Sequence, residues 1–93
     1  MDLQTFERSL ASDQPPELSS YLLAMWYDAK GDWNTAHDIV NDKEGAKAAW
    51  VHAYLHRKEG DKGNAAYWYA RAGKPVSTLS FDAEWKEIIN ALL

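Results

Sequence analysis

The sequence contains no cysteine, which excludes disulfide bonds and thiolate metal ligands. It has no run of about 18 consecutive apolar residues, so no segment is expected to span a membrane. The first ten residues have neither a basic region nor an apolar stretch, so no secretory signal is expected. These absences suit a cytoplasmic protein, and we expect that location.

An excess of basic residues is also missing. The net charge is −4, and because phosphate contacts require a basic surface, nucleic-acid binding is not expected. The charges are unevenly placed: residues 1–45 carry nine acids and three bases, whereas residues 46–93 carry five acids and seven bases. This asymmetry could steer a partner or a second copy of the chain, or it could belong to an ordinary solvated surface.

Signatures of common enzyme classes are absent too. His52 is followed by Ala53, so the HExxH pattern of metalloproteases is not formed. Gly60 and Gly63 follow no predicted strand and therefore do not make a phosphate-binding loop. No serine stands beside a histidine in the arrangement of an activated nucleophile. We predict no catalytic residue, and a non-enzyme is favoured.

Hydrophobic residues make up 46% of the chain and five are tryptophan, which argues for a folded domain. Between residues 23 and 73 one helical pattern occurs twice, as LAMWYDAKGDWNTAHDIV and as HAYLHRKEGDKGNAAYWY. Each copy contains a Gly-Asp step, Gly31-Asp32 or Gly60-Asp61, and these steps lie 29 residues apart. A glycine that ends one helix and an aspartate that caps the next predict two antiparallel helices in each copy.

The pattern resembles the tetratricopeptide repeat. The matching residues of the first copy are Leu23, Ala24, Tyr27, Gly31, Asp32, Trp33 and Ala36, and those of the second are Gly60, Asp61, Ala65, Tyr69, Ala72 and Pro75. The chain departs from the family in its period, which is about 34 residues there. His52 and His56 replace a Leu and a Tyr, and no Trp stands at the usual place. Sel1-like repeats are the nearest alternative family. The chain also resembles a group of small bacterial proteins, a likeness that implies no function.

We therefore predict an all-α single domain over residues 1–93, with five or six antiparallel helices. The repeat units are expected at about 17–42 and 46–73, and a C-terminal capping helix at about 80–93. The individual helices are expected at 2–11, from Pro15-Pro16 to Lys30, at 32–41, at 46–59, at 62–72 and after a capping Ser80. The last helix has an apolar stripe that predicts a cap on the second unit, with a dimer interface as the alternative. Its stripe comprises Phe81, Trp85, Ile88, Ile89 and Leu92, and Glu84 and Glu87 are expected to be solvated.

The resemblance to tetratricopeptide repeats implies a groove, lined by the first helix of each unit, that holds a peptide. The positions carried over from the family are Tyr21, Met25, Asp28, Trp50, Tyr54, Arg57 and Lys58. Aromatic rings there could grip a side chain, and Arg57 and Lys58 could meet a carboxylate. Alternatively, the N- or C-terminal helix fills the groove. The leading interpretation is a small non-catalytic interaction module or self-associating scaffold, without a cofactor, that binds a protein or peptide partner and could form a homodimer.

A histidine pair supports a different class of function. His52 and His56 are four residues apart and share a helix face. With a third ligand such as His37 or Glu59, they could hold a divalent metal such as zinc or a small ligand, either in a binding protein or in an enzyme. The simpler account is structural: buried neutral imidazoles that hydrogen-bond to a tyrosine or to a backbone carbonyl.

The aromatic run Tyr67-Trp68-Tyr69 cannot face the core entirely, because successive helical residues diverge by about 100°. Tyr69 takes the inward repeat position, and Trp68 shares a flank with Asn64 and Arg71. This flank could be a binding surface or plain packing.

Overall fold

The computed structural model describes residues 1–93 and contains six α-helices and no strand, which confirms the all-α prediction. The helices are α1 (Leu3–Ser9), α2 (Ser20–Ala29), α3 (Trp33–Asn41), α4 (Ala46–Lys58), α5 (Lys62–Ala72) and α6 (Phe81–Leu92). None of them combines the length and apolar character that crossing a bilayer requires.

The helix pairs α2–α3 and α4–α5 are joined by the same turn. Gly31 and Gly60 both have φ of 85°, the left-handed region in which a Cβ would be strained. In each turn the next N–H reaches back five residues: Asp32 donates to the Tyr27 carbonyl and Asp61 to the His56 carbonyl, at 2.9 and 3.0 Å. Both aspartate side chains then cap the following helix. The 29-residue repeat is therefore a repeat of backbone geometry.

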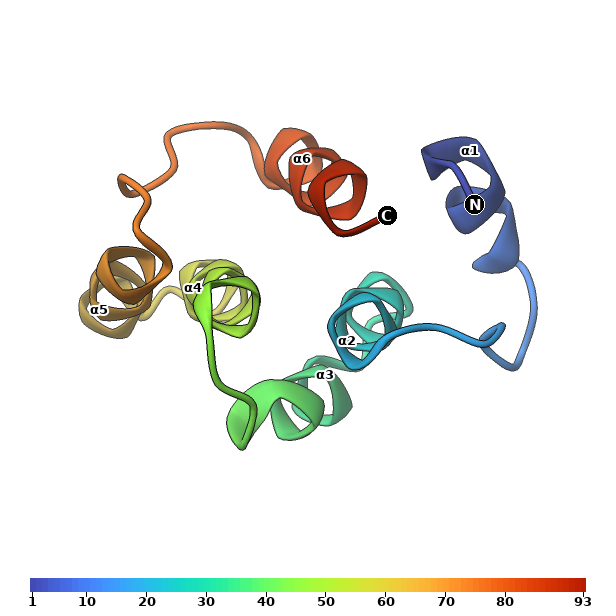
Figure 1. Cartoon of the computed structure of the whole chain (residues 1–93), viewed down its shortest axis with the longest axis horizontal. Helices are drawn as coiled ribbons and strands as arrows, with labels where there is room; N and C mark the ends of the chain where they lie inside the picture. The colour runs from blue at the N-terminus through green and yellow to red at the C-terminus, as the bar shows by residue number, and fades with distance from the viewer.

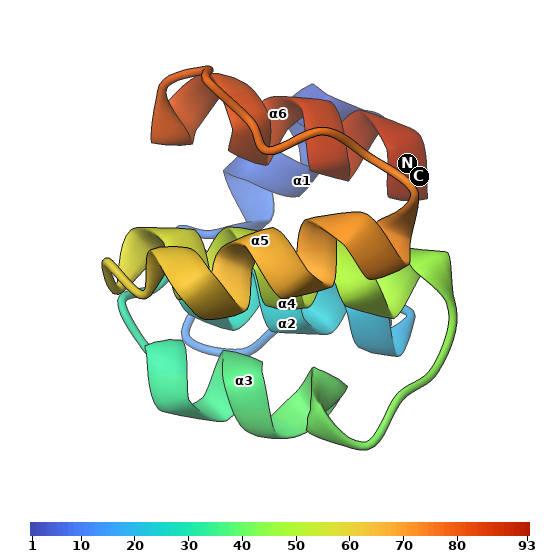
Figure 2. The ribbon, with the colours of Figure 1, turned by 90° about the vertical axis from the view of Figure 1, so that its left-hand side faces the viewer.

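The helices form three layers around α4, which packs against α2, α3, α5 and α6. Figure 2 shows α2, α4 and α5 in the middle layer, with α3 on one side and α1 and α6 on the other. In Figure 1 the middle layer is a row that begins with α5 at one end and finishes with α2 at the other, and α1 lies beyond α2 at that same end of the molecule. The connection from residue 73 to residue 80 carries the chain from α5 across to α6.

Packing of α6 on the middle layer completes the core. Trp85, Ile88 and Ile89 are buried on α6, which contacts both α2 and α4. Phe6 packs the short helix α1 against α6, with its ring centroid 5.7 Å from that of Trp85. The inner faces of both helical hairpins are thus covered by the two ends of the chain.

Two predicted boundaries were wrong. Helix α2 begins at Ser20, where the hydroxyl of Ser19 accepts a hydrogen bond from the Leu22 N–H, and not at Pro15-Pro16. A residue before a proline is disfavoured from the helical region, which keeps the start of this segment extended. Helix α1 ends at Ser9, earlier than expected.

Candidate functional site

The face predicted to hold a peptide contacts α6, because Trp50 and Arg57 on this face both hydrogen-bond to Glu84. Met25, Trp50 and Tyr54 are all buried, and Tyr21 is half-buried. The charged members of the predicted set are engaged in ion pairs with other helices. These seven residues therefore hold the chain together at the inner face.

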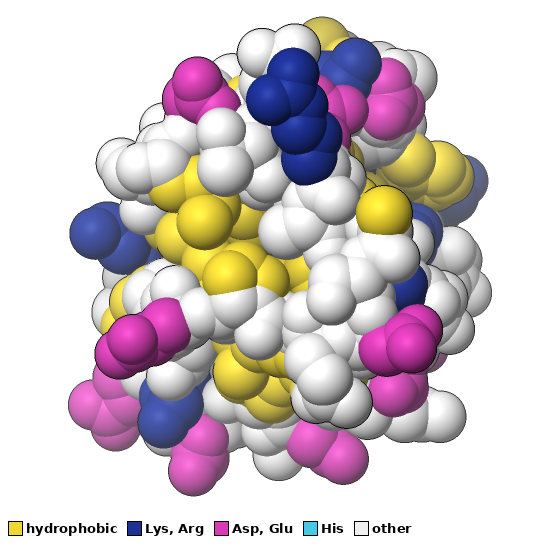
Figure 3. Space-filling model, turned by 90° about the vertical axis from the view of Figure 1, so that its right-hand side faces the viewer, with side chains coloured by type: hydrophobic (Ala, Val, Ile, Leu, Met, Phe, Trp, Pro, Cys, Tyr) yellow, Lys and Arg dark blue, Asp and Glu magenta, His cyan; other side chains and the backbone are white.

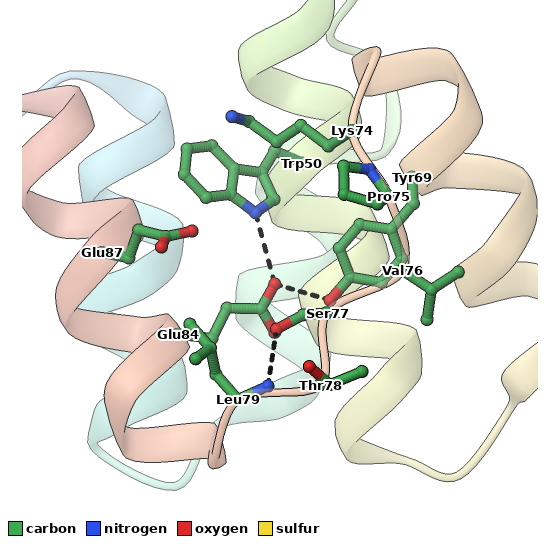
Figure 4. Close-up of a pocket in the computed structure, with 10 residues that line it drawn as sticks. All are labelled: Trp50, Tyr69, Lys74, Pro75, Val76, Ser77, Thr78, Leu79, Glu84 and Glu87. Atoms are coloured by element: carbon green, nitrogen blue, oxygen red, sulfur yellow. Dashed lines mark hydrogen bonds between the residues drawn. The ribbon is translucent and has the colours of Figure 1, made fainter.

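Glu84 is the centre of the contact between α4, α5 and α6. Its side chain is 0% exposed, which corrects the expectation that it is solvated. One carboxylate oxygen accepts from Trp50 Nε1 at 3.3 Å and from the Tyr69 hydroxyl at 2.6 Å, and the other accepts from Arg57 at 2.9 Å. The first two bonds are drawn in Figure 4, beside a cavity of about 310 Å³ under the loop that leads to α6. Burial and the adjacent carboxylate raise the pKa of the Tyr69 hydroxyl, which keeps it a hydrogen-bond donor.

A second, partly buried ion pair joins the two hairpins. Lys58 Nζ of α4 lies 3.1 and 3.0 Å from the carboxylate oxygens of Asp28 on α2. Burial raises the pKa of Asp28, and the Lys58 ammonium opposes that rise. Lys58, which the sequence offered as a group that could meet a peptide carboxylate, is therefore paired with a buried carboxylate of its own chain.

The three histidines meet on the other side of α4, between the two hairpins. His37 comes from α3, and His52 and His56 come from α4. One ring nitrogen of each lies within 4.8 Å of a ring nitrogen of the other two. His52 and His56 are 1% and 8% exposed, and His37 is half-buried. The structure thus brings together three of the four ligand candidates from the sequence.

In two of these imidazoles, one ring nitrogen already makes a hydrogen bond to a group outside the cluster. His52 Nε2 lies 3.0 Å from the Val40 carbonyl oxygen, and His56 Nδ1 lies 2.6 Å from a carboxylate oxygen of Glu59. A carbonyl and a carboxylate only accept hydrogen bonds, so each of these nitrogens carries the proton. Glu59, predicted as a ligand, lies behind His56 as its hydrogen-bond partner. His52 Nδ1 is buried and has no hydrogen-bond partner.

Two tryptophans enclose the histidines. The Trp33 ring stacks on His37 with centroids 4.9 Å apart, and the Trp68 ring stacks on His52 at 4.1 Å. Trp33 Nε1 also donates to the Leu55 carbonyl at 2.8 Å. Trp33 was not predicted to lie here, although its place four residues before His37 on one helix was a usable signal. Trp68 is half-buried and packs on His52 with one face of its ring.

Comparison with protein-family models, with curated proteins and with solved structures finds no significant match to this chain. The likeness to tetratricopeptide repeats stays a prediction.

Proposed function

We propose that this chain is a small non-catalytic helical scaffold that associates end to end with further copies of itself. The observation that carries the proposal is the open outer face of α5, at one end of the row of helices in Figure 1. Helix α5 packs along its length against α4, and it also contacts α6 through the hydrogen bond from the Tyr69 hydroxyl to Glu84. Helix α3, which holds the same place one repeat earlier, packs against both α2 and α4. The second hairpin thus lacks the neighbour that the first hairpin has.

The outer face of α5 suits a close helix contact. Gly63, Ala66, Tyr67 and Ala70 share this face at helical spacing, and all four are exposed. Small residues allow another helix to approach closely. Tyr67 is 53% exposed and accepts a hydrogen bond from Arg71 at 2.9 Å. Tyrosine and arginine are the residue types that contribute most to protein interfaces, so this face supports a protein partner.

The opposite end of the row offers a matching surface. Figure 3 looks onto this end and shows hydrophobic side chains gathered near its middle, with acidic and basic side chains around them. The link between α1 and α2 runs here, and its half-buried hydrophobic residues are Leu10, Pro15, Pro16 and Leu18. Residues 2–19 carry four acids and one base, whereas residues 62–74 carry three bases and no acid. Opposite charges at the two ends favour a second copy of the chain as the partner.

A head-to-tail contact of this kind is heterologous, so it propagates into a ring or a filament. A standard interface buries about 800 Å² on each partner. The surface of one chain is 5295 Å², so each contact would cover about a seventh of it. Such a share is compatible with one contact at each end of the molecule.

Replacing Ala66 by glutamate should weaken self-association about tenfold or more, because a bulky acid would meet the acidic end of the next copy. Sedimentation equilibrium over a wide concentration range, at low and at high salt, measures this. We expect the mass of the unmodified chain to rise with concentration and this rise to diminish in salt. The matched control is Ala83→Glu, the same change at an exposed position of α6 away from both ends. A chain that stays monomeric throughout, or an equal loss in the control, would contradict the proposal.

A further inference from the structure

We infer that His37, His52 and His56 form a binding site for one divalent transition-metal ion of the zinc class, which links the two helical hairpins. This site is formed by α3 and α4, so it is separate from the two surfaces of the proposed self-association. It therefore goes beyond the proposed scaffold role. It rests on three separate features: the convergence of the imidazoles, the bonds that orient them, and an unsatisfied nitrogen.

The first feature is convergence from two elements. His52 and His56 lie one turn apart on α4, and His37 arrives from α3 of the other hairpin. One ring nitrogen of each histidine lies within 4.8 Å of a ring nitrogen of the other two. Around a tetrahedral zinc ion with bonds of about 2.0–2.1 Å, ligand nitrogens lie about 3.4 Å apart. Small rotations of the imidazoles would close this difference without moving either helix.

The second feature is the outer set of hydrogen bonds. Histidines that bind a metal usually donate their other N–H to a backbone carbonyl or to a carboxylate. His52 does so to the Val40 carbonyl, and His56 does so to Glu59. These bonds leave a lone pair on His52 Nδ1 and on His56 Nε2, which we assign as ligand atoms. The third ligand would come from His37, whose ring is oriented by stacking on Trp33.

The third feature is His52 Nδ1 itself. It is the single buried side-chain nitrogen or oxygen in the chain that has no hydrogen-bond partner. Such an atom carries an uncompensated desolvation cost, which a bound ion would remove.

The ligand chemistry selects the class of ion. Imidazole nitrogens suit zinc, cobalt, nickel and copper, whereas calcium and magnesium require oxygen ligands. Three protein ligands leave one coordination position for water. Because the ligands belong to α3 and α4, a bound ion would fix the packing of one hairpin on the other. A stabilising role follows from this placement.

The test is a titration of the untagged full-length protein with Co²⁺ after treatment with a chelator, followed by displacement with Zn²⁺. We expect one ion per chain, visible absorption bands typical of four-coordinate cobalt, and a higher unfolding temperature when zinc is bound. Quenching of tryptophan fluorescence by Cu²⁺ gives a second readout, because Trp33 and Trp68 stack on the ligand rings.

The variants separate this site from its neighbours. His37→Gln should weaken binding at least about a hundredfold, and Glu59→Gln about 10–100-fold through loss of the outer hydrogen bond. Glu87→Gln on α6 is the control and should bind as the unmodified chain does. His37 is half-buried, so its variant is expected to fold, and circular dichroism checks this.

Absence of stoichiometric binding, or binding that survives His37→Gln, would overturn the inference. If metal binding survived His37→Gln but was lost in Asp61→Asn, the ion would lie at the neighbouring group of His56, Glu59 and Asp61. The Ala66→Glu variant should bind metal normally, so a failure of the scaffold proposal is distinguishable from a failure of this one.

Discussion

Replacement of Glu84 by alanine is expected to lower the free energy of unfolding by about 3–5 kcal/mol. The change removes the carboxylate that accepts hydrogen bonds from Trp50, Tyr69 and Arg57. It leaves the largely buried Arg57 guanidinium without its partner, which is the costly way to break a buried ion pair. A domain is stabilised by only about 5–15 kcal/mol in total, so the loss would be a large part of it.

Urea unfolding followed by circular dichroism measures the effect of the Glu84 substitution. Glu87→Ala is the matched control, since this exposed glutamate lies one turn further along α6 and should change stability by no more than about 0.5 kcal/mol. Glu84→Gln keeps two hydrogen-bonding groups but loses the charge. Its loss in free energy of unfolding should therefore fall between those of Glu84→Ala and Glu87→Ala. If Glu84→Ala and Glu87→Ala were equally stable, the buried network would contribute little to the fold.

The turns and most helices could be predicted because their signals are local. Each Gly-Asp step contains both the residue that ends one helix and the residue that caps the next. Ser80 likewise caps α6 through a hydrogen bond from the Ala83 N–H. Such features depend on neighbours in the sequence, and the structure has them where they were predicted.

The orientation of α6 could not be predicted in the same way. The apolar stripe placed Phe81 inward and Glu84 outward, whereas Phe81 is 45% exposed and Glu84 is fully buried. The reason is non-local: α4 and α5 present Arg57 and Tyr69 to the first turn of α6, and these groups satisfy a carboxylate there. Periodicity records which residues are apolar, but it carries no information on which buried polar partners another helix will supply.

The histidine site was predicted in part. The spacing of His52 and His56 placed them on one face of a helix, and the structure has both of them buried beside His37. The orientation of the His52 and His56 rings could not be predicted, because it depends on hydrogen bonds to the Val40 carbonyl and to Glu59. For the same reason Glu59 was predicted as a ligand, while the structure gives it the outer position that orients His56.

Replacement of Trp85 by alanine is expected to cost about 3–5 kcal/mol of stability and to release α1 from the rest of the chain. Trp85 joins three helices: its ring packs against Phe6 of α1, and its Nε1 lies 3.5 Å from the Met25 carbonyl oxygen of α2. Helix α1 contains seven residues; it packs against α6, and its Ser9 hydroxyl accepts a hydrogen bond from Trp26 Nε1 of α2 at 3.1 Å. A helix of this length does not persist in water without tertiary contacts.

Urea unfolding gives the overall cost of the Trp85 substitution, and hydrogen exchange resolved by residue shows where it acts. We expect the amides of residues 6–9 to lose protection before those of α4, because α4 keeps its contacts with α2, α3 and α5. Phe81→Ala is the control: it removes an aromatic ring from the same helix at an exposed position and should cost less than about 1 kcal/mol. Uniform loss of protection across all six helices would show that α1 unfolds only with the whole domain. In that case the N-terminal helix belongs to the same cooperative unit as the two hairpins, and its removal would unfold the scaffold.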